Sequence, residues 1–144
     1  MAAYLDTSVL VPLFFQEAGT VSARAEIGSE ASRWVSHWTL AEFASATAFK
    51  LRTGQIDPAT AATAERLFAE FVASGLTVVD VLREDFVSAA RLCGSTPAPW
   101  LRTPDALHLA VAQRLGLALL SFDKALIGAC RVHGTPCRSG THHD

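Results

Sequence analysis

The sequence has 144 residues, of which 50% are hydrophobic and 18% charged, a balance that indicates one packed globular domain and excludes an intrinsically disordered chain. Lys and Arg number 12 and Asp and Glu 14, so the formal charge of −2 excludes a global positive field that would attract nucleic acid or an anionic membrane. A nuclease remains compatible with this charge, because metal ions can meet the phosphate at the reacting centre.

The cysteines and the N-terminus bear on the compartment. Cys93, Cys130 and Cys137 form no C-x-x-C pair, so we expect reduced thiols and no disulfide framework. No basic stretch precedes an apolar core, and the apolar run Val9–Phe15 is short and contains Pro12. These features fit neither a signal peptide nor a membrane span, and we therefore expect a cytoplasmic protein.

The first half of the chain predicts strands and helices in alternation. Apolar residues recur at spacings of three and four from Leu40 to Leu51, which is the period of a buried helical face. The expected elements are a strand at Ala2–Leu5, helices at Thr7–Phe15 and Thr20–Gly28, a strand at Arg33–Trp38, a helix from Leu40 that Gly54 ends, and a helix from Pro58, capped by Asp57, to about Ala73.

The second half continues the alternation. The expected elements are a strand at Leu76–Leu82, a helix at Glu84–Leu92, a loop at Gly94–Pro99, a helix at Thr103–Leu115 ended by Gly116, a strand at Leu117–Leu120, a turn at Ser121–Asp123, a helix to about Cys130 and a strand near Val132–Pro136. We expect residues 1–137 to form a single domain and residues 138–144 to be a flexible C-terminal tail.

This order predicts the fold class α/β, a three-layer α/β/α arrangement with a central, mainly parallel sheet. Each parallel crossover needs a long connection, and the connecting helices cover both faces of the sheet. Ligands of such sheets bind outside the carboxyl ends of the strands. Acidic residues at strand ends and helix starts are therefore the candidates for a site.

Four acids occupy such places in the predicted order of elements, namely Asp6, Glu42, Asp105 and Asp123. Carboxylates that converge repel one another, which raises pKa values unless a cation offsets the repulsion. Mg²⁺ or Mn²⁺ suits this set, because both ions prefer oxygen ligands and keep several waters. The histidines and cysteines show no zinc-ligand spacing.

Each acid also has a simpler explanation as part of a helix N-terminus. Asp6 and Asp123 stand directly before predicted helices and suit a cap. Thr39 and Glu42 match the capping box, in which each side chain bonds the other residue's backbone amide. Asp105 lies in a first turn, behind Thr103 as the expected cap and Pro104 as the first helical residue, where the helix dipole favours a carboxylate.

Taken in order, four segments resemble the successive acidic motifs of PIN-domain nucleases, most closely the VapC-type toxins of type II toxin–antitoxin pairs. The segments are Tyr4-Leu5-Asp6-Thr7-Ser8, Leu40-Ala41-Glu42, Thr103-Pro104-Asp105-Ala106-Leu107-His108-Leu109-Ala110 and Leu120-Ser121-Phe122-Asp123-Lys124. The resemblance spans almost the whole chain and implies a PIN-like fold. It also implies that Asp6, Glu42, Asp105 and Asp123 bind Mg²⁺ or Mn²⁺, directly or through water, and that Ser121 is the hydroxyl accompanying the last acid.

The activity implied by this resemblance is a metal-dependent endoribonuclease, a hydrolase of RNA phosphodiester bonds. Thr7 or Ser8 would orient a ligand. A cognate antitoxin and a homodimer are implied as partners, and no membrane. His108 lies one turn from Asp105, and we expect it to be a packed or partly exposed helix residue rather than a catalytic one. We expect Arg102 and Lys124 to be solvated charges or phosphate contacts.

Two other functions fit parts of the pattern. An Asp at a strand end suits a phosphatase with Asp6 as nucleophile, although Ser8 stands where the haloacid-dehalogenase pattern has a second Asp. A non-catalytic binding module would use the four acids only as caps and would dock a basic partner. Activity that depends on added metal distinguishes the nuclease from the binding module.

Overall fold

The computed structural model describes residues 1–17, 19–97 and 100–139 of the chain. Its centre is a five-stranded sheet in the order β3-β2-β1-β4-β5, in which every neighbouring pair is parallel. The strands are β1 (Ala2–Leu5), β2 (Ser32–Ser36), β3 (Thr77–Val79), β4 (Ala118–Ser121) and β5 (Cys137–Ser139). The sequence-based fold class is therefore confirmed.

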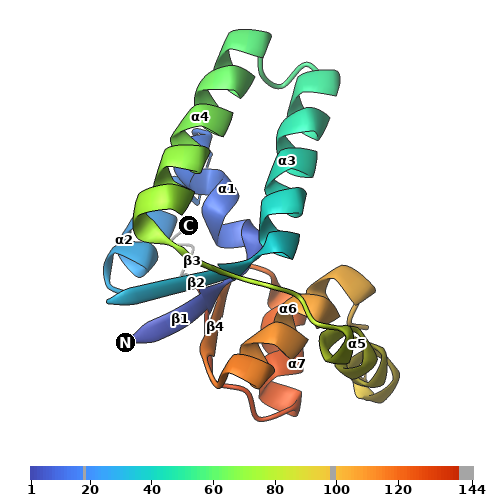
Figure 1. The fold of residues 1–144 in the computed structure, drawn as a ribbon. Coiled ribbons are helices and arrows are strands. Elements are labelled where there is room, and N and C mark those ends of the chain that lie inside the picture. The colour runs from blue at the N-terminus through green and yellow to red at the C-terminus, as the bar shows by residue number, and fades with distance from the viewer. Residues whose placement is uncertain (18, 98–99, 140–144) are drawn as a thin grey trace.

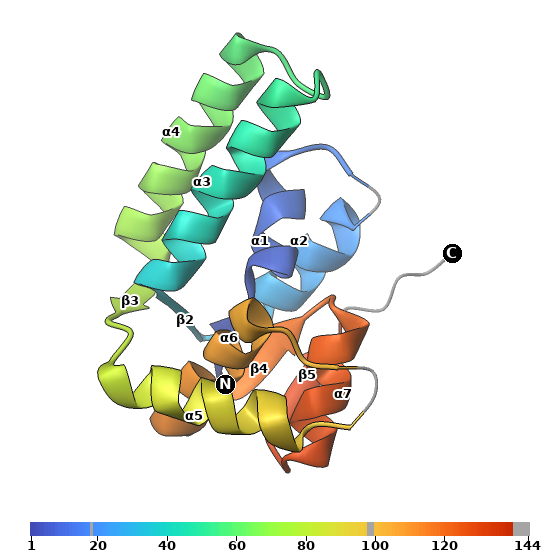
Figure 2. The same cartoon turned by 90° about the vertical axis from the view of Figure 1, so that its right-hand side faces the viewer.

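Helices cover both faces of the sheet (Figure 1). On one face lie α1 (Thr7–Phe14), α2 (Thr20–Gly28), α3 (His37–Arg52) and α4 (Pro58–Gly75). On the other lie α5 (Arg83–Ser95), α6 (Thr103–Leu115) and α7 (Lys124–Val132). Seen from the side, α3 and α4 form a long antiparallel pair that extends beyond the sheet (Figure 2). No helix within the described ranges is both long and apolar enough to cross a membrane.

Two hydrophobic clusters, one on each face, hold these layers together. Successive side chains of a strand point to opposite faces, so Ala3 and Leu5 of β1 pack in the cluster beneath α1, α3 and α4. Tyr4, between them, packs in the cluster beneath α5, α6 and α7. Ala3, Tyr4 and Leu5 are fully buried, because helices cover the central strand β1 on both faces. A strand buried in this way is apolar along its length.

Several predicted boundaries of strands and helices are wrong. Strand β2 ends at Ser36, so His37 and Trp38 belong to α3 and not to the strand. Strand β3 is much shorter than the predicted Leu76–Leu82, and Gly94 belongs to α5 instead of the predicted loop. Residues 98–99 of that loop lie outside the described residues.

The last strand was also misplaced by the sequence pattern. Helix α7 continues to Val132, and Gly134, with φ +67°, makes the turn that follows it, so the strand begins only at Cys137. Arg138 pairs with Leu120 and therefore belongs to the sheet, not to a tail. The rest of the predicted tail, residues 140–144, lies outside the described residues.

Candidate metal centre

The candidate acids come together at the carboxyl edge of the sheet. Asp6 follows β1, and Ser121 ends the neighbouring strand β4, where Leu5 pairs with Leu120. Glu42 lies in α3, which follows β2, and Asp105 lies in the first turn of α6. Because the strands are parallel, these chain segments all leave the sheet at one edge.

Asp6 uses its carboxylate for contacts in the site. It occupies the N-cap position of α1, yet its side chain makes no capping hydrogen bond to the described backbone of that helix. Its Oδ2 instead accepts hydrogen bonds from Ser8 Oγ over 2.6 Å and from Ser121 Oγ over 2.8 Å. The capping explanation for Asp6 is therefore wrong.

Ser121 ties three chain segments together at this edge. Besides donating to Asp6, its hydroxyl oxygen accepts a hydrogen bond from the Asp123 backbone N–H over 2.9 Å and lies 3.3 Å from Ser8 Oγ. Ser8 Oγ in turn accepts from the Phe122 backbone N–H over 2.9 Å. The hydroxyl predicted to accompany the last acid thus fixes the loop that carries Asp123.

Glu42 is held by side chains from other elements and does not cap a helix. Helix α3 begins at His37, whereas a Thr39–Glu42 capping box would need it to begin at Leu40. Thr39 therefore lies inside the helix, where its Oγ1 accepts a hydrogen bond of 3.3 Å from the Ser36 backbone N–H. Glu42 Oε1 accepts a hydrogen bond from Thr7 Oγ1 over 2.8 Å and contacts His108 Nε2. The predicted Thr39–Glu42 capping box is wrong because α3 starts earlier than the apolar pattern indicated.

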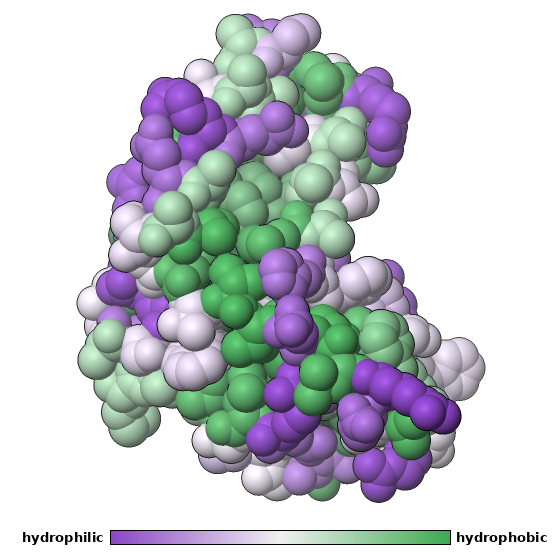
Figure 3. Space-filling model, viewed as in Figure 1, coloured by the Kyte–Doolittle hydropathy of each residue, from purple (hydrophilic) through white to green (hydrophobic). Residues whose placement is uncertain are grey.

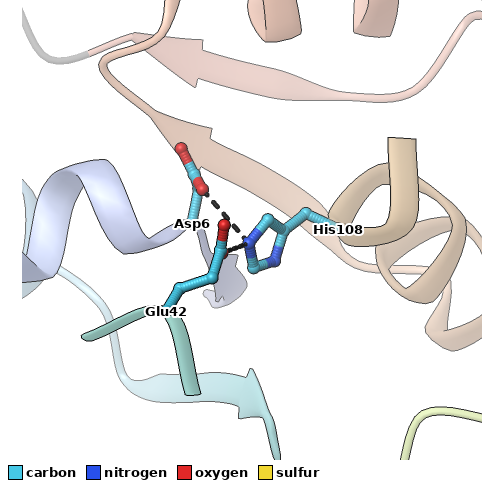
Figure 4. A group of neighbouring side chains, drawn as sticks. All are labelled: Asp6, Glu42 and His108. Carbon is cyan, nitrogen blue, oxygen red and sulfur yellow. Dashed lines mark hydrogen bonds and ion pairs between the residues drawn. The ribbon is translucent and has the colours of Figure 1, made fainter. Parts of the chain in front are cut away.

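His108 directs one ring nitrogen at both Asp6 and Glu42 (Figure 4). Its ring is fully buried, with Nε2 bonded to Glu42 and 3.4 Å from Asp6 Oδ1, while Nδ1 is 2.8 Å from the Tyr4 hydroxyl. Asp6, Glu42 and His108 each offer one ligand atom within 4.8 Å of the other two. Burial by itself lowers the pKa of His108, but the hydrogen bond to Glu42 and the charge of Asp6 raise it above its ordinary value.

Asp105 shows the repulsion between the acids most directly. Burial, and then the negative charges of Asp123 and Asp6, raise the pKa of Asp105 to about 6. Arg102, whose Nε is 3.6 Å from Asp105 Oδ2, opposes this increase. Arg102 also occupies the N-cap position of α6, so the prediction that Thr103 is the cap is wrong, although Asp105 does lie in the first turn.

Asp123 both caps a helix and contributes charge to the site. Its Oδ1 accepts a hydrogen bond of 2.9 Å from the Leu126 backbone N–H at the start of α7. The predicted cap is therefore confirmed. The charge of Asp123 also raises the pKa of Asp105, more than the charge of Asp6 does.

The surface gives access to this edge of the sheet. The molecule is indented between the end formed by α3 and α4 and the end formed by α5 to α7 (Figure 3). Glu42 and Asp105 come from helices on opposite sides of this indentation. The Glu42 side chain is 26% exposed, whereas that of Asp6 is 6% exposed. Glu42 is therefore the more accessible of these two acids.

A comparison with protein families decides the classification, because the family model described as PIN domain matches residues 3–131. The chain belongs to the PIN-domain family. Comparison with curated protein sequences gives no match. The family match covers all four candidate acids as well as Ser121 and His108.

Solved structures with the same PIN fold include components of toxin–antitoxin systems. VapC20 of Mycobacterium tuberculosis, described as a sarcin–ricin loop cleaving toxin, aligns with a TM-score of 0.71 at 19% identity, over 90% of this chain and 95% of that one. VapBC2 of Rickettsia felis, bound to a promoter DNA fragment, aligns with a TM-score of 0.69 at 14% identity, over 98% of this chain and 100% of that one. FitAcB of Neisseria gonorrhoeae aligns with a TM-score of 0.70 at 14% identity, over 97% of this chain and 98% of that one. At these identities the similarity establishes the fold.

Sequence reasoning missed the part that His108 and Tyr4 play in this PIN domain. His108 was expected to be a packing residue, but its two ring nitrogens contact Glu42 and Tyr4. The available signal was its polarity, since all its neighbours from Ala106 to Ala112 are buried and apolar. Arg102 and Lys124, the possible phosphate contacts, are exposed near the acids.

Proposed function

We propose that this PIN domain is a metal-dependent endoribonuclease and acts as the toxin of a toxin–antitoxin pair. The observation that carries the proposal is the convergence of the Asp6 and Glu42 carboxylates, whose ligand atoms lie within 4.8 Å of each other and of His108, beside an Asp105 whose pKa is raised to about 6 by burial and by neighbouring acids. A set of acids that repel one another in this way is stabilised when a divalent cation binds among them.

The donor set fits Mg²⁺ or Mn²⁺. Asp6, Glu42 and Asp105 would hold the ion, and Asp123 would do so directly or through water. Once bound, the ion acts as a Lewis acid that makes a water more acidic and offsets charge on the phosphate oxygens. Oxygen ligands dominate the set, as both ions prefer, and the indented surface leaves Glu42 partly exposed to solvent and substrate.

The protein's own contribution is to hold the carboxylates in place. Ser8 and Ser121 donate to Asp6, and Thr7 donates to Glu42, so the two acids cannot rotate freely. Hydrogen bonds of this kind to ligating carboxylates are a large part of what makes a metal site effective. They support the assignment of Ser121 to the catalytic site and of Thr7 or Ser8 to orienting ligands.

RNA is the proposed substrate, and a cognate antitoxin is the proposed partner. One similar structure is described as a sarcin–ricin loop cleaving toxin, and another is a toxin–antitoxin complex from Klebsiella pneumoniae. We also propose a homodimer and a cytoplasmic location. Coexpression with the neighbouring small open reading frame should yield a complex, and light scattering that shows a lone monomer in both preparations would contradict both the dimer and the complex.

Glu42→Gln tests the nuclease assignment, because it removes the charge and keeps the size of the side chain. The assay is cleavage of total RNA and of tRNA with Mg²⁺ or Mn²⁺, with and without chelator, beside a thermal melt. We expect cleavage to fall by about 100-fold or more while Tm moves by a few degrees at most. Asp105→Asn should abolish cleavage in the same way.

Glu70→Gln is the matched control. Glu70 lies on the exposed face of α4, where it pairs with Arg66, and its change should leave cleavage unaltered. If Glu42→Gln cleaves RNA as fast as the wild type, the assignment of Glu42 is wrong. If the wild type binds no Mn²⁺ or Mg²⁺ and cleaves none of these RNAs, the binding-module alternative is favoured.

A further inference from the structure

We infer that His108, fixed by Tyr4, is a positioning residue that orients Glu42 for the metal ion. The inference rests on the proposed function and explains how one ligand of that site is held. Tyr4 lies in β1, His108 in α6 and Glu42 in α3, and the three side chains form a continuous chain of hydrogen bonds. Figure 4 shows the His108 ring directed at the Glu42 and Asp6 carboxylates.

The proton positions in this chain follow from the chemistry of its members. A carboxylate can only accept, so His108 Nε2 is the donor to Glu42. In the neutral ring, Nδ1 then has no proton and accepts from the Tyr4 hydroxyl, 2.8 Å away. The Ser36 hydroxyl, 2.8 Å from the Tyr4 oxygen, donates to Tyr4 in turn. In the protonated ring Nδ1 donates to the Tyr4 oxygen instead, so in both states Tyr4 holds the ring with Nε2 directed at Glu42.

The donors to Glu42 leave one of its oxygens for ligation. Thr7 Oγ1 and His108 Nε2 both reach Oε1, and they approach it from β1–α1 and from α6. Two contacts to a single oxygen fix the rotation of the carboxylate and direct Oε2 away from them. Asp6 is held similarly, since both serine donors reach its Oδ2.

Burial places His108 behind Glu42, away from solvent. The His108 side chain is 0% exposed, whereas that of Glu42 is 26% exposed. An ion that keeps water ligands and meets a phosphate would need solvent access, which Glu42 has and His108 does not. His108 therefore acts through Glu42. A buried imidazole is also costly unless it is hydrogen-bonded, and an apolar residue would pack at this position at lower cost.

Calorimetric titration with Mn²⁺ tests this assignment in four variants. His108→Leu removes both ring nitrogens and should weaken Mn²⁺ binding by about 10- to 100-fold. Tyr4→Phe removes only the hydroxyl that holds His108 Nδ1, and should weaken binding by about 10-fold. His108→Gln keeps an N–H donor near the position of Nε2 and should bind Mn²⁺ within a few-fold of the wild type.

His133→Leu is the matched control. His133 Nε2 also bonds a hydroxyl, Thr96 Oγ1 at 2.8 Å, but outside the site, so this variant should bind Mn²⁺ like the wild type. Thermal melts of all four variants without metal separate lost stability from lost affinity. Rescue by His108→Gln is a result that a purely structural role for His108 would not produce.

Pulsed electron paramagnetic resonance of the Mn²⁺-loaded protein distinguishes positioning from ligation. We expect no coupling to a directly bound nitrogen. A strong nitrogen coupling that His108→Leu abolishes would make His108 a ligand and overturn the inference. The inference would be overturned, and the proposed function kept, if His108→Leu and Tyr4→Phe bound Mn²⁺ as tightly as the wild type while Glu42→Gln bound it weakly. Absence of Mn²⁺ binding by the wild type would overturn it together with the proposed function.

Discussion

Ser121 donates a hydrogen bond of 2.8 Å to Asp6 across 115 positions of the sequence. The contact joins the carboxyl ends of β4 and β1, which are neighbours in the sheet. A parallel arrangement brings such distant positions together at one edge, and the hydroxyl then fixes the direction of the acid. The serine is therefore as much a part of the site as the carboxylate that it holds.

Ser121→Ala should weaken Mn²⁺ binding and RNA cleavage by about 10-fold, because Asp6 keeps only its contact with Ser8. The same change leaves the partly buried Asp123 N–H without its acceptor, which should cost about 1 kcal/mol of unfolding free energy. Urea unfolding and Mn²⁺ calorimetry measure the two effects. Thr47→Ala removes a buried hydroxyl from the middle of α3 and should lower only the stability.

The order of strands and helices was predictable because the buried elements are strongly periodic. Strand β1 and helices α2 and α6 begin and end where the apolar pattern and the punctuating residues place them. The largest errors lie at the short edge strands, and smaller ones at the end of β2 and the start of α3. β3 and β5 have three residues each, too few for an alternating pattern, and β5 contains Arg138. Pairing with neighbours far away in sequence defines these strands, and local sequence does not carry that information.

The acids of the site were predictable because sheet topology alone places strand ends together. Thr7, Ser8 and Ser121 were also expected beside the acids, whereas the contacts of His108 with Glu42 and Tyr4 were not. Whether Glu42 caps α3 depends on where that helix begins, and Ser36 and Thr39 are both suitable hydroxyls. The direction of the His108 ring depends on the hydroxyl of Tyr4, which comes from a strand 104 positions earlier. Such contacts become visible only when the packing of α6 on β1 is known.

Asp123 has two roles that substitution can separate. Asp123→Asn keeps a side-chain acceptor for the Leu126 N–H but removes the charge, so Tm should stay within a few degrees while Mn²⁺ affinity falls. Asp123→Ala removes the acceptor as well. It should lower the unfolding free energy by about 1 kcal/mol more, which lowers Tm by about 2–4 °C. If Asp123→Asn binds Mn²⁺ and cleaves RNA like the wild type, Asp123 is a cap alone.

Arg114 and Asp85 should matter for stability but not for the site. Arg114 Nε and a terminal nitrogen donate to the two Asp85 oxygens at 2.8 and 3.0 Å, and Asp85 is 1% exposed. Arg114→Met leaves this buried carboxylate without its cation and should lower the unfolding free energy by about 3 kcal/mol. Equilibrium urea unfolding measures the loss. The Mn²⁺ affinity of the folded protein, measured without urea, should be unchanged. A large change in that affinity would connect this ion pair to the metal centre.

Asp105 should make the metal-free protein less stable as the pH rises. Burial, together with Asp123 and Asp6, raises the pKa of Asp105 to about 6, above the value of about 4 expected in the unfolded chain. The folded state then binds the proton more tightly, so stability falls between pH ~4 and ~6 and the loss is complete above that range. Asp105→Asn cannot ionise and escapes this loss. With chelator present, it should exceed the wild type by about 2 kcal/mol at pH 7 and match it near pH 4.

Urea unfolding at a series of pH values, with chelator and then with Mn²⁺, checks this expectation. Added Mn²⁺ should stabilise the wild type at pH 7 and leave Asp105→Asn nearly unaffected, because ligand binding stabilises only the form that binds. The order of stability of the two proteins should therefore reverse on loading with metal. If Asp105→Asn is the less stable protein at pH 7 in chelator, burial and the neighbouring acids do not raise the pKa of Asp105, and the metal-centre argument loses its electrostatic support.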